Sequence, residues 1–179
     1  MNGKTLKLVY CALFTALACV ATMIIKVPSF YGYANVGDTI VLISAWLLGG
    51  VYGAIAAGIG SALADLLSGY AYYVPGTFII KFLMAFVAYI IFKKLSVKFS
   101  KKIVGLVVSG FVAEVIMIIG YFLYKAFILG KGYLAAVPSI FSNIGQGVTC
   151  LVIAILLFYA LEKSNFNKVF RNSMMKGDE

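Results

Sequence analysis

The stretch that decides the fold covers Ile40–Leu67 and reads IVLISAWLLGGVYGAIAAGIGSALADLL. Asp65 is the only charged residue in it. As a single α-helix this stretch would be about 40 Å long, whereas the hydrocarbon core of a bilayer is about 30 Å thick. The helix must therefore break, and the pair Gly49-Gly50 is the natural place for the break. We expect two short membrane spans, at about 37–48 and 51–68.

The whole chain has the composition of a membrane protein. Of its 179 residues 63% are hydrophobic and 12% are charged, whereas about a quarter of the residues in soluble domains are charged. Its mean hydropathy is +1.03. Further apolar runs lie at about 6–27, 76–92, 103–127 and 138–161. We therefore predict an all-α integral membrane protein, a six-transmembrane-helix bundle in which residues 1–179 form a single transmembrane domain.

Lysine and arginine are distributed unevenly between the two sides of this bundle. Of the 15 Lys and Arg residues, eleven fall on one side and the remaining four lie on or toward the other. The eleven are Lys4, Lys7, Lys93, Lys94, Lys98, Lys101, Lys102, Lys163, Lys168, Arg171 and Lys176. The four are Lys26, Lys81, Lys125 and Lys131. Basic residues concentrate on the cytoplasmic side, so both termini are predicted to be cytoplasmic. Topology and anionic lipid then explain the net charge of +9 without a nucleic-acid partner.

The composition argues against catalysis and against metal binding. There is no histidine, which removes the commonest general base and the commonest transition-metal ligand. The three cysteines, Cys11, Cys19 and Cys150, lie in apolar runs, where cysteine behaves as a small hydrophobic residue. Gly3-Lys4-Thr5 lacks the first glycine and the preceding strand of a phosphate-binding loop. We predict that the chain is not an enzyme, holds no metal and no cofactor, and binds no ATP itself.

Polar side chains converge at one depth of the predicted bundle, toward the outside. Ionisable residues inside membrane spans are costly, so they mark a pathway, a binding site or a packing pair. The candidate substrate-binding residues are Tyr31, Asn35, Asp38, Asp65, Tyr73, Thr77, Lys81, Glu114, Tyr121, Asn143 and Gln146. Polar groups beside aromatic loops are the composition of a small-solute pocket, here open to the exterior.

Three of these residues also have a purely structural interpretation. Asp65 and Lys81 could pair to cancel two buried charges, since ions inside a membrane usually find partners. Asp38 follows Gly37 and could cap the N-terminus of a helix.

The polar residues of the last two spans leave a similar choice. The amides of Asn143 and Gln146 could form hydrogen bonds between helices. Glu114 has no basic neighbour in its own span, so we expect it to face a cavity.

Several short motifs together carry a family resemblance that extends over nearly the whole chain. They are Asn35-Val-Gly37-Asp38, Leu47-Leu48-Gly49-Gly50-Val-Tyr-Gly53, Gly58-Ile-Gly60-Ser61-Ala-Leu-Ala-Asp65 and Pro75-Gly-Thr77-Phe-Ile-Ile-Lys81. Asn143 and Gln146 match the same pattern. On these residues the chain resembles the substrate-binding S components of energy-coupling factor (ECF) vitamin transporters. It looks most like the riboflavin-type branch, which includes carriers for pyridoxine, hydroxymethylpyrimidine and pantothenate.

The resemblance implies an architecture and a set of partners. S components have six helices in a prokaryotic plasma membrane, and their outward pocket is formed by the loop after the first span and by the fourth to sixth spans. They work with a transmembrane coupling subunit and two ATP-binding subunits. Ala12-Leu-Phe-Thr-Ala16 matches the Ala-x-x-x-Ala motif with which such proteins contact the coupling subunit, so Ala12 and Ala16 are the candidate docking residues.

The function expected from these observations is capture of a vitamin or vitamin precursor for uptake. Asp38, Asp65 and Glu114 outnumber Lys81, which favours a neutral or cationic solute whose ring stacks on tyrosines. Pyridoxine or hydroxymethylpyrimidine is therefore expected first and riboflavin next. Pantothenate, an anion, would need Lys81 free.

The sequence is less consistent with two other classes of function. An autonomous secondary transporter is the alternative, but the chain shows neither an internal repeat nor a matching pair of proline-broken helices. A membrane enzyme would use Asp65 and Glu114 as acid and base, yet the predicted topology separates these carboxylates by depth.

Overall fold

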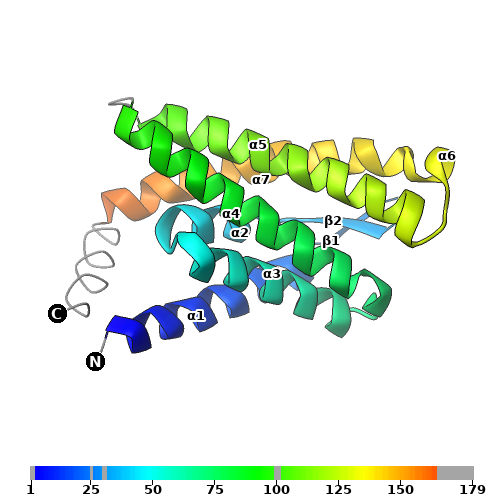
Figure 1. Ribbon diagram of the computed structural model, residues 1–179, viewed down its shortest axis with the longest axis horizontal. Helices are drawn as coiled ribbons and strands as arrows, with labels where there is room; N and C mark the ends of the chain where they lie inside the picture. The colour runs from blue at the N-terminus through cyan, green and yellow to red at the C-terminus, as the bar shows by residue number, and fades with distance from the viewer. Residues whose placement is uncertain (1–2, 25, 30–31, 99–101, 165–179) are drawn as a thin grey trace.

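The computed structural model describes residues 3–24, 26–29, 32–98 and 102–164, and these are almost entirely helical. Long helices run back and forth along one axis (Figure 1). The elements are, in chain order, α1 (Gly3–Ile24), β1 (Lys26–Ser29), β2 (Gly32–Asn35), α2 (Gly37–Leu47), α3 (Gly50–Leu67), the 3-10 helix η1 (Ala71–Tyr73), α4 (Val74–Lys98), α5 (Lys102–Leu123), the π-helix η2 (Tyr124–Ile128), α6 (Tyr133–Ala136) and α7 (Pro138–Lys163).

The break at Gly49-Gly50 occurs where the sequence predicts it. Both glycines have left-handed backbones, with φ of 67° and 51°, a conformation that glycine adopts without steric cost. The N–H of Gly49 donates to the carbonyl of Ser44 at 3.0 Å. A Cβ on Gly49 would lie 2.7 Å from the ring of Tyr89 on α4. The turn therefore needs glycine for its backbone and for its lack of a side chain.

The segment after the first helix differs from the prediction. A span was expected up to residue 27 and an aromatic loop after it, but α1 ends at Ile24 and an antiparallel hairpin follows. It pairs Lys26 with Asn35 at one end and Ser29 with Gly32 at the other. Proline disfavours helical conformation in the residue before it, so Pro28 helps to end the helix early. Tyr31 lies outside the described residues.

Two later boundaries also differ. The basic stretch 93–102 was expected as a loop, but α4 remains helical as far as Lys98. Lysine is a good helix former and can extend its ammonium group from a membrane helix end into water. The span predicted to end near 127 ends as an α-helix at Leu123 and continues as the π-helix η2, in which the Leu129 N–H donates to the Tyr124 carbonyl at 3.0 Å.

Helix α3 packs closely on its neighbours because its contact positions are glycine. A Cβ on Gly60 would lie 2.4 Å from the carbonyl oxygen of Thr15 on α1, and a Cβ on Gly53 would lie 2.6 Å from that of Ser44 on α2. Small residues allow this approach of helix backbones inside a membrane. Helix α3 also packs on α4, so three helices meet around it.

Five helical segments of the described chain are long and apolar enough to cross a bilayer: α1, α3, α4 with η1, α5 with η2, and α6 with α7. Helix α2 is apolar but has only 11 residues, about 16 Å at 1.5 Å per residue. That is roughly half the thickness of the hydrocarbon core. The second predicted span is thus a half-length helix, and the β hairpin precedes it.

The two ends of the bundle differ in composition. The start of α1, the turn between α2 and α3, the end of α4, the start of α5 and the end of α7 gather at one end (Figure 1). We call this the basic end, for Lys4, Lys7, Lys93, Lys94, Lys102 and Lys163. The hairpin, η1 and α6 lie toward the opposite end. A cytoplasmic basic end remains a prediction from the distribution of charge.

Candidate functional site

A cavity lies among the helices on the side of η1, η2 and the end of the hairpin. The cavity has a volume of about 70 Å³, and its mouth is open. The lining residues are Thr22, Asn35, Ser61, Asp65, Tyr70, Tyr73, Thr77, Lys81, Tyr121, Lys125, Asn143 and Gln146. Polar and aromatic side chains from α1, β2, α3, η1, α4, α5, η2 and α7 therefore meet around one space.

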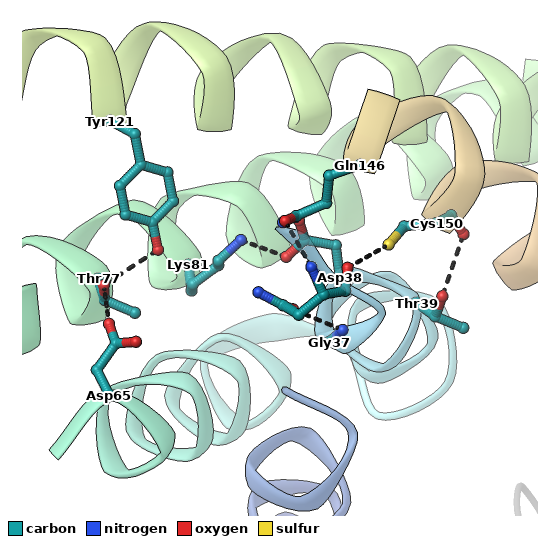
Figure 2. Close-up of polar contacts among 10 residues, drawn as sticks. Gly37, Asp38, Thr39, Asp65, Thr77, Lys81, Tyr121, Gln146 and Cys150 are labelled. Carbon is teal, nitrogen blue, oxygen red and sulfur yellow. Dashed lines mark hydrogen bonds and ion pairs between the residues drawn. The ribbon is translucent and has the colours of Figure 1, made fainter. Parts of the chain in front are cut away.

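A network centred on Asp38 closes one side of the cavity (Figure 2). Asp38 is completely buried in the first turn of α2. Its Oδ1 accepts from the ammonium of Lys81 on α4, and its Oδ2 accepts from Nε2 of Gln146 on α7 at 2.6 Å. The other end of the same amide, Oε1 of Gln146, accepts from the backbone N–H of Asn35 at 2.9 Å. One carboxylate thus ties together α2, α4, α7 and the hairpin.

The alternative that Asp38 caps a helix is wrong. Asp38 lies inside α2, whose N-cap residue Val36 makes no side-chain cap hydrogen bond. The capping bond comes from Asn35, whose Oδ1 accepts from the Gly37 N–H at 2.8 Å. Because Asn35 supplies this bond, Asp38 is left to accept from Lys81.

A second network lies next to the first, around Asp65. The hydroxyl of Thr77 donates to Oδ2 of Asp65 at 2.5 Å. Since that hydroxyl has a single proton, the O–H of Tyr121 donates to Thr77 Oγ1 at 3.0 Å. The sequence suggested a pair between Asp65 and Lys81, but the ion pair of Lys81 is with Asp38. Its ammonium also lies 5.3 Å from the ring centroid of Tyr121, within cation–π range.

Aromatic rings form the wall toward the opposite end. The Tyr73 ring centroid lies 6.4 Å from that of Tyr121 and 6.0 Å from that of Tyr124. The Tyr124 hydroxyl donates to the Tyr72 carbonyl at 2.7 Å, joining η2 to η1. The ammonium of Lys125 lies 5.8 Å from the centroid of Tyr73. A planar solute entering here would meet ring faces and a cation.

Glu114 lies outside the cavity lining. The sequence led us to expect it to face a cavity, but it is buried on α5 against Gly147 of α7, where a Cβ would lie 3.1 Å from Oε2 of Glu114. Neither carboxylate oxygen has a hydrogen-bond partner among the described residues. The side chain lies toward α7, so a contact between Glu114 and the solute stays a prediction.

The remaining predicted residues are placed as follows. Eight line the cavity: Asn35, Asp65, Tyr73, Thr77, Lys81, Tyr121, Asn143 and Gln146. The lining also contains four residues that were not among the candidates: Thr22, Ser61, Tyr70 and Lys125. Helical spacing gave a signal for two of them, because Ser61 lies one turn before Asp65 and Lys125 one turn after Tyr121.

The candidate docking residues lie on a different surface. Ala12 and Ala16 are exposed on α1, and exposed Val9, Leu13 and Val20 lie close to them along the same helix. The opposite side of α1 packs on α2 and α3. This apolar surface is available to lipid or to another membrane helix.

The described residues contain no group of three His, Cys, Asp or Glu side chains able to hold a metal ion. All three cysteines are free thiols, and Cys150 Sγ donates to the carbonyl of Asn35 at 3.3 Å. Cys150 therefore reinforces the bond by which α7 holds the hairpin.

Two comparisons with known proteins point to ECF S components, and a third found an uncharacterized relative. Residues 2–163 match the family described as ECF-type riboflavin transporter, S component. The chain is 32% identical over 146 residues to an uncharacterized protein of Pyrococcus woesei, covering 80% of this chain and 93% of that protein. The solved structure of the S component of a bacterial ECF transporter matches with a TM-score of 0.68 and 24% sequence identity. The match covers 89% of this chain and 97% of the chain in that structure. The two share a fold, which confirms the predicted all-α membrane architecture.

The family match covers all the helices, the hairpin and every described residue of the cavity lining. It confirms the resemblance found in the sequence. The chain belongs to the family of S components of ECF-type riboflavin transporters, multi-pass proteins of the plasma membrane that serve uptake and are not enzymes.

Proposed function

We propose that this chain captures a small water-soluble vitamin or vitamin precursor from outside the cell and delivers it with an ATP-driven ECF module. The observation that carries the proposal is the cavity, which is lined by polar and aromatic side chains from eight elements, η1 and η2 at the end away from the basic end among them. The coupling subunit and two ATP-binding subunits would supply the energy. The exposed face of α1 at Ala12 and Ala16 is the proposed contact with the coupling subunit.

The charges of the cavity favour a neutral ring-bearing solute. Lys81 is neutralised by Asp38, which leaves Asp65 and Lys125 as the other charged residues of the lining. With Glu114 outside the lining and Lys125 within it, Asp38 and Asp65 balance Lys81 and Lys125, which removes the acidic excess that favoured a cation. Pyridoxine and hydroxymethylpyrimidine remain the first candidates, because each presents one small aromatic ring to Tyr73 and Tyr121. An anion such as pantothenate has less support, since Lys81 is already paired.

Riboflavin is the second candidate, and the family's own description favours it. Its ring system is larger and also neutral, so the same aromatic wall would serve it. A larger ring would extend farther toward η1 and η2.

Binding to the isolated chain tests the proposal. The purified chain in lipid nanodiscs would be titrated calorimetrically with pyridoxine, hydroxymethylpyrimidine, riboflavin and pantothenate, and mass spectrometry would identify any solute that co-purifies. We expect saturable one-to-one binding of a neutral ring compound. Thr77→Val, which cuts the link between Asp65 and Tyr121, should weaken binding, whereas Ser139→Ala, outside the cavity, should not. Wild-type protein that binds none of the four would contradict the proposed function.

A further inference from the structure

Several hydroxyls on these helices donate to a backbone carbonyl in the preceding turn. Thr15 bonds to Cys11 at 2.9 Å, and Ser139 bonds to Ala136 at 2.7 Å. Ser44 and Ser109 do the same. This is the usual way in which a membrane helix satisfies a hydroxyl.

Ser61 on α3 is an exception. Its side chain is 1% exposed, and its Oγ has no hydrogen-bond partner among the described residues. It lies in the cavity wall, one helical turn before Asp65. Ser96 also lacks a partner, but it is not part of the cavity lining. Buried polar groups in native proteins are nearly always hydrogen-bonded, so an unpaired one in a cavity wall points to an occupant.

Asn143 on α7 supplies a second unpaired group to the same cavity. Its Nδ2 is buried and has no partner in the described part of the chain. Other polar groups of the lining are engaged by the protein: Thr77 by Asp65 and Tyr121, and Gln146 by Asn35 and Asp38. The amide N–H only donates, whereas a serine hydroxyl can donate or accept.

We propose that Ser61 is a solute-binding residue, and that Ser61 and Asn143 together recognise the hydrogen-bonding edge of the solute's ring. This inference rests on the proposed function and deepens it. Ser61 lies on α3, outside the loop and the later helices that the family resemblance assigns to the pocket. The solute must carry at least one acceptor for Asn143, such as a ring nitrogen or a carbonyl oxygen, while Tyr73 and Tyr121 contact the face of the ring.

Ser61 is also adjacent to a close contact between α3 and α1. Gly60 precedes Ser61 and lies against the backbone of Thr15 on α1. A solute bound to Ser61 would therefore contact α3 one residue from the interface between α3 and α1, the helix that carries Ala12 and Ala16. This places solute recognition next to the helix proposed for docking.

Calorimetric titration of matched variants tests the inference. Wild type, Ser61→Ala, Asn143→Ala and the control Ser139→Ala would be titrated in nanodiscs with pyridoxine, hydroxymethylpyrimidine and riboflavin. For a solute that binds wild type, Ser61→Ala and Asn143→Ala should each weaken binding by roughly five- to tenfold. Ser139→Ala should leave the affinity unchanged. The unfolding temperature of solute-free Ser61→Ala should equal or exceed that of wild type, because no intramolecular bond is lost.

The possible failures can be told apart. Wild type that binds none of the three solutes counts against the proposed function. Wild type that binds, with Ser61→Ala within about twofold of it, overturns the role of Ser61 alone. A solute-free Ser61→Ala that unfolds at a lower temperature than wild type also overturns it, since the hydroxyl would then have a structural partner.

Discussion

Asp38 shows how a single residue organises the site. A carboxylate with no exposed surface is costly unless it is paired and hydrogen-bonded, and here Lys81 and Gln146 meet both of its oxygens. The partners come from helices far apart in the chain. The Asp38 network therefore forms only when α2, α4 and α7 are all in place.

Replacing Lys81 should show how strongly the fold depends on the Asp38 network. Lys81→Met leaves the carboxylate of Asp38 buried without its counter-charge, which should cost about 3–5 kcal/mol of stability. The double variant Lys81→Met with Asp38→Asn should recover most of the loss. Thermal unfolding in detergent measures both. Recovery by Lys81→Met with Asp65→Asn instead would show that Asp65 is the partner that matters.

Gln146 is expected to hold the hairpin. Gln146→Ala removes the acceptor of the Asn35 N–H and one donor to Asp38, so stability should fall by about 1–3 kcal/mol. Asn143→Ala, one turn earlier on α7, removes no such intramolecular bond and serves as the control. Hydrogen exchange at the Asn35 amide should become faster in Gln146→Ala only. Equal protection of that amide in both variants would contradict the assignment.

At residue scale the sequence predicted which polar groups gather but not how they pair. Costly polar residues in apolar spans pointed to Asn35, Asp65, Thr77 and Lys81, and all four line the cavity. The partner of Lys81 could not be predicted, because pairing depends on the depth at which α2 begins. That depth is set by the hairpin, a segment whose residues indicated only a loop.

Among the elements, the turn between α2 and α3 makes the most specific demand on sequence. Gly49 combines φ of 67° with ψ of 177°, a region open essentially to glycine only. Gly49→Ala should therefore lower the free energy of unfolding by about 1–3 kcal/mol. The clash of the new Cβ with the ring of Tyr89 should lower it further. Gly69→Ala, also left-handed but in open space, should lose less, and helical Gly145→Ala should be neutral. Unfolding temperatures in a different order would contradict this explanation.

The exposed face of α1 should separate docking from binding. Ala12→Trp or Ala16→Trp adds bulk where a partner helix would approach, so uptake by the complete transporter in vesicles should fall roughly tenfold or more. Solute affinity of the isolated chain should not change. Leu156→Trp, on the exposed face of α7, is the control and should alter neither. Equal loss of uptake and affinity in the Ala12 variant would contradict the separation of the two surfaces.

The presence of the long helices could be predicted from hydropathy, whereas the residues at which they end could not. The break at Gly49-Gly50 was predictable because its signal is local. The early end of α1 was not, since it depends on pairing between Lys26 and Asn35 across the hairpin. The π-helix at Tyr124–Ile128 is likewise set by tertiary contacts, including the bond from Tyr124 to Tyr72.

At the scale of the whole molecule, we propose that this chain binds the solute and that other subunits hydrolyse ATP. The purified chain alone should bind solute but show no ATP hydrolysis above that of empty nanodiscs, because Gly3-Lys4-Thr5 is not a complete phosphate loop. ATP-dependent uptake should appear only when a coupling subunit and ATP-binding subunits are added. Gradient-driven uptake by the chain alone would support the secondary-transporter alternative instead.

The shortness of α2 bears on how the protein is made. A helix of 11 residues is too short to enter the bilayer unaided as it leaves the ribosome, and it carries Asp38, whose insertion near mid-membrane costs about 3 kcal/mol. We expect α2 to enter together with α3 as one unit. Asp38 then stays without its partners until synthesis has delivered Lys81 and later Gln146. Although α2 is translated second among the helices, it would thus be among the last to reach its final packed position.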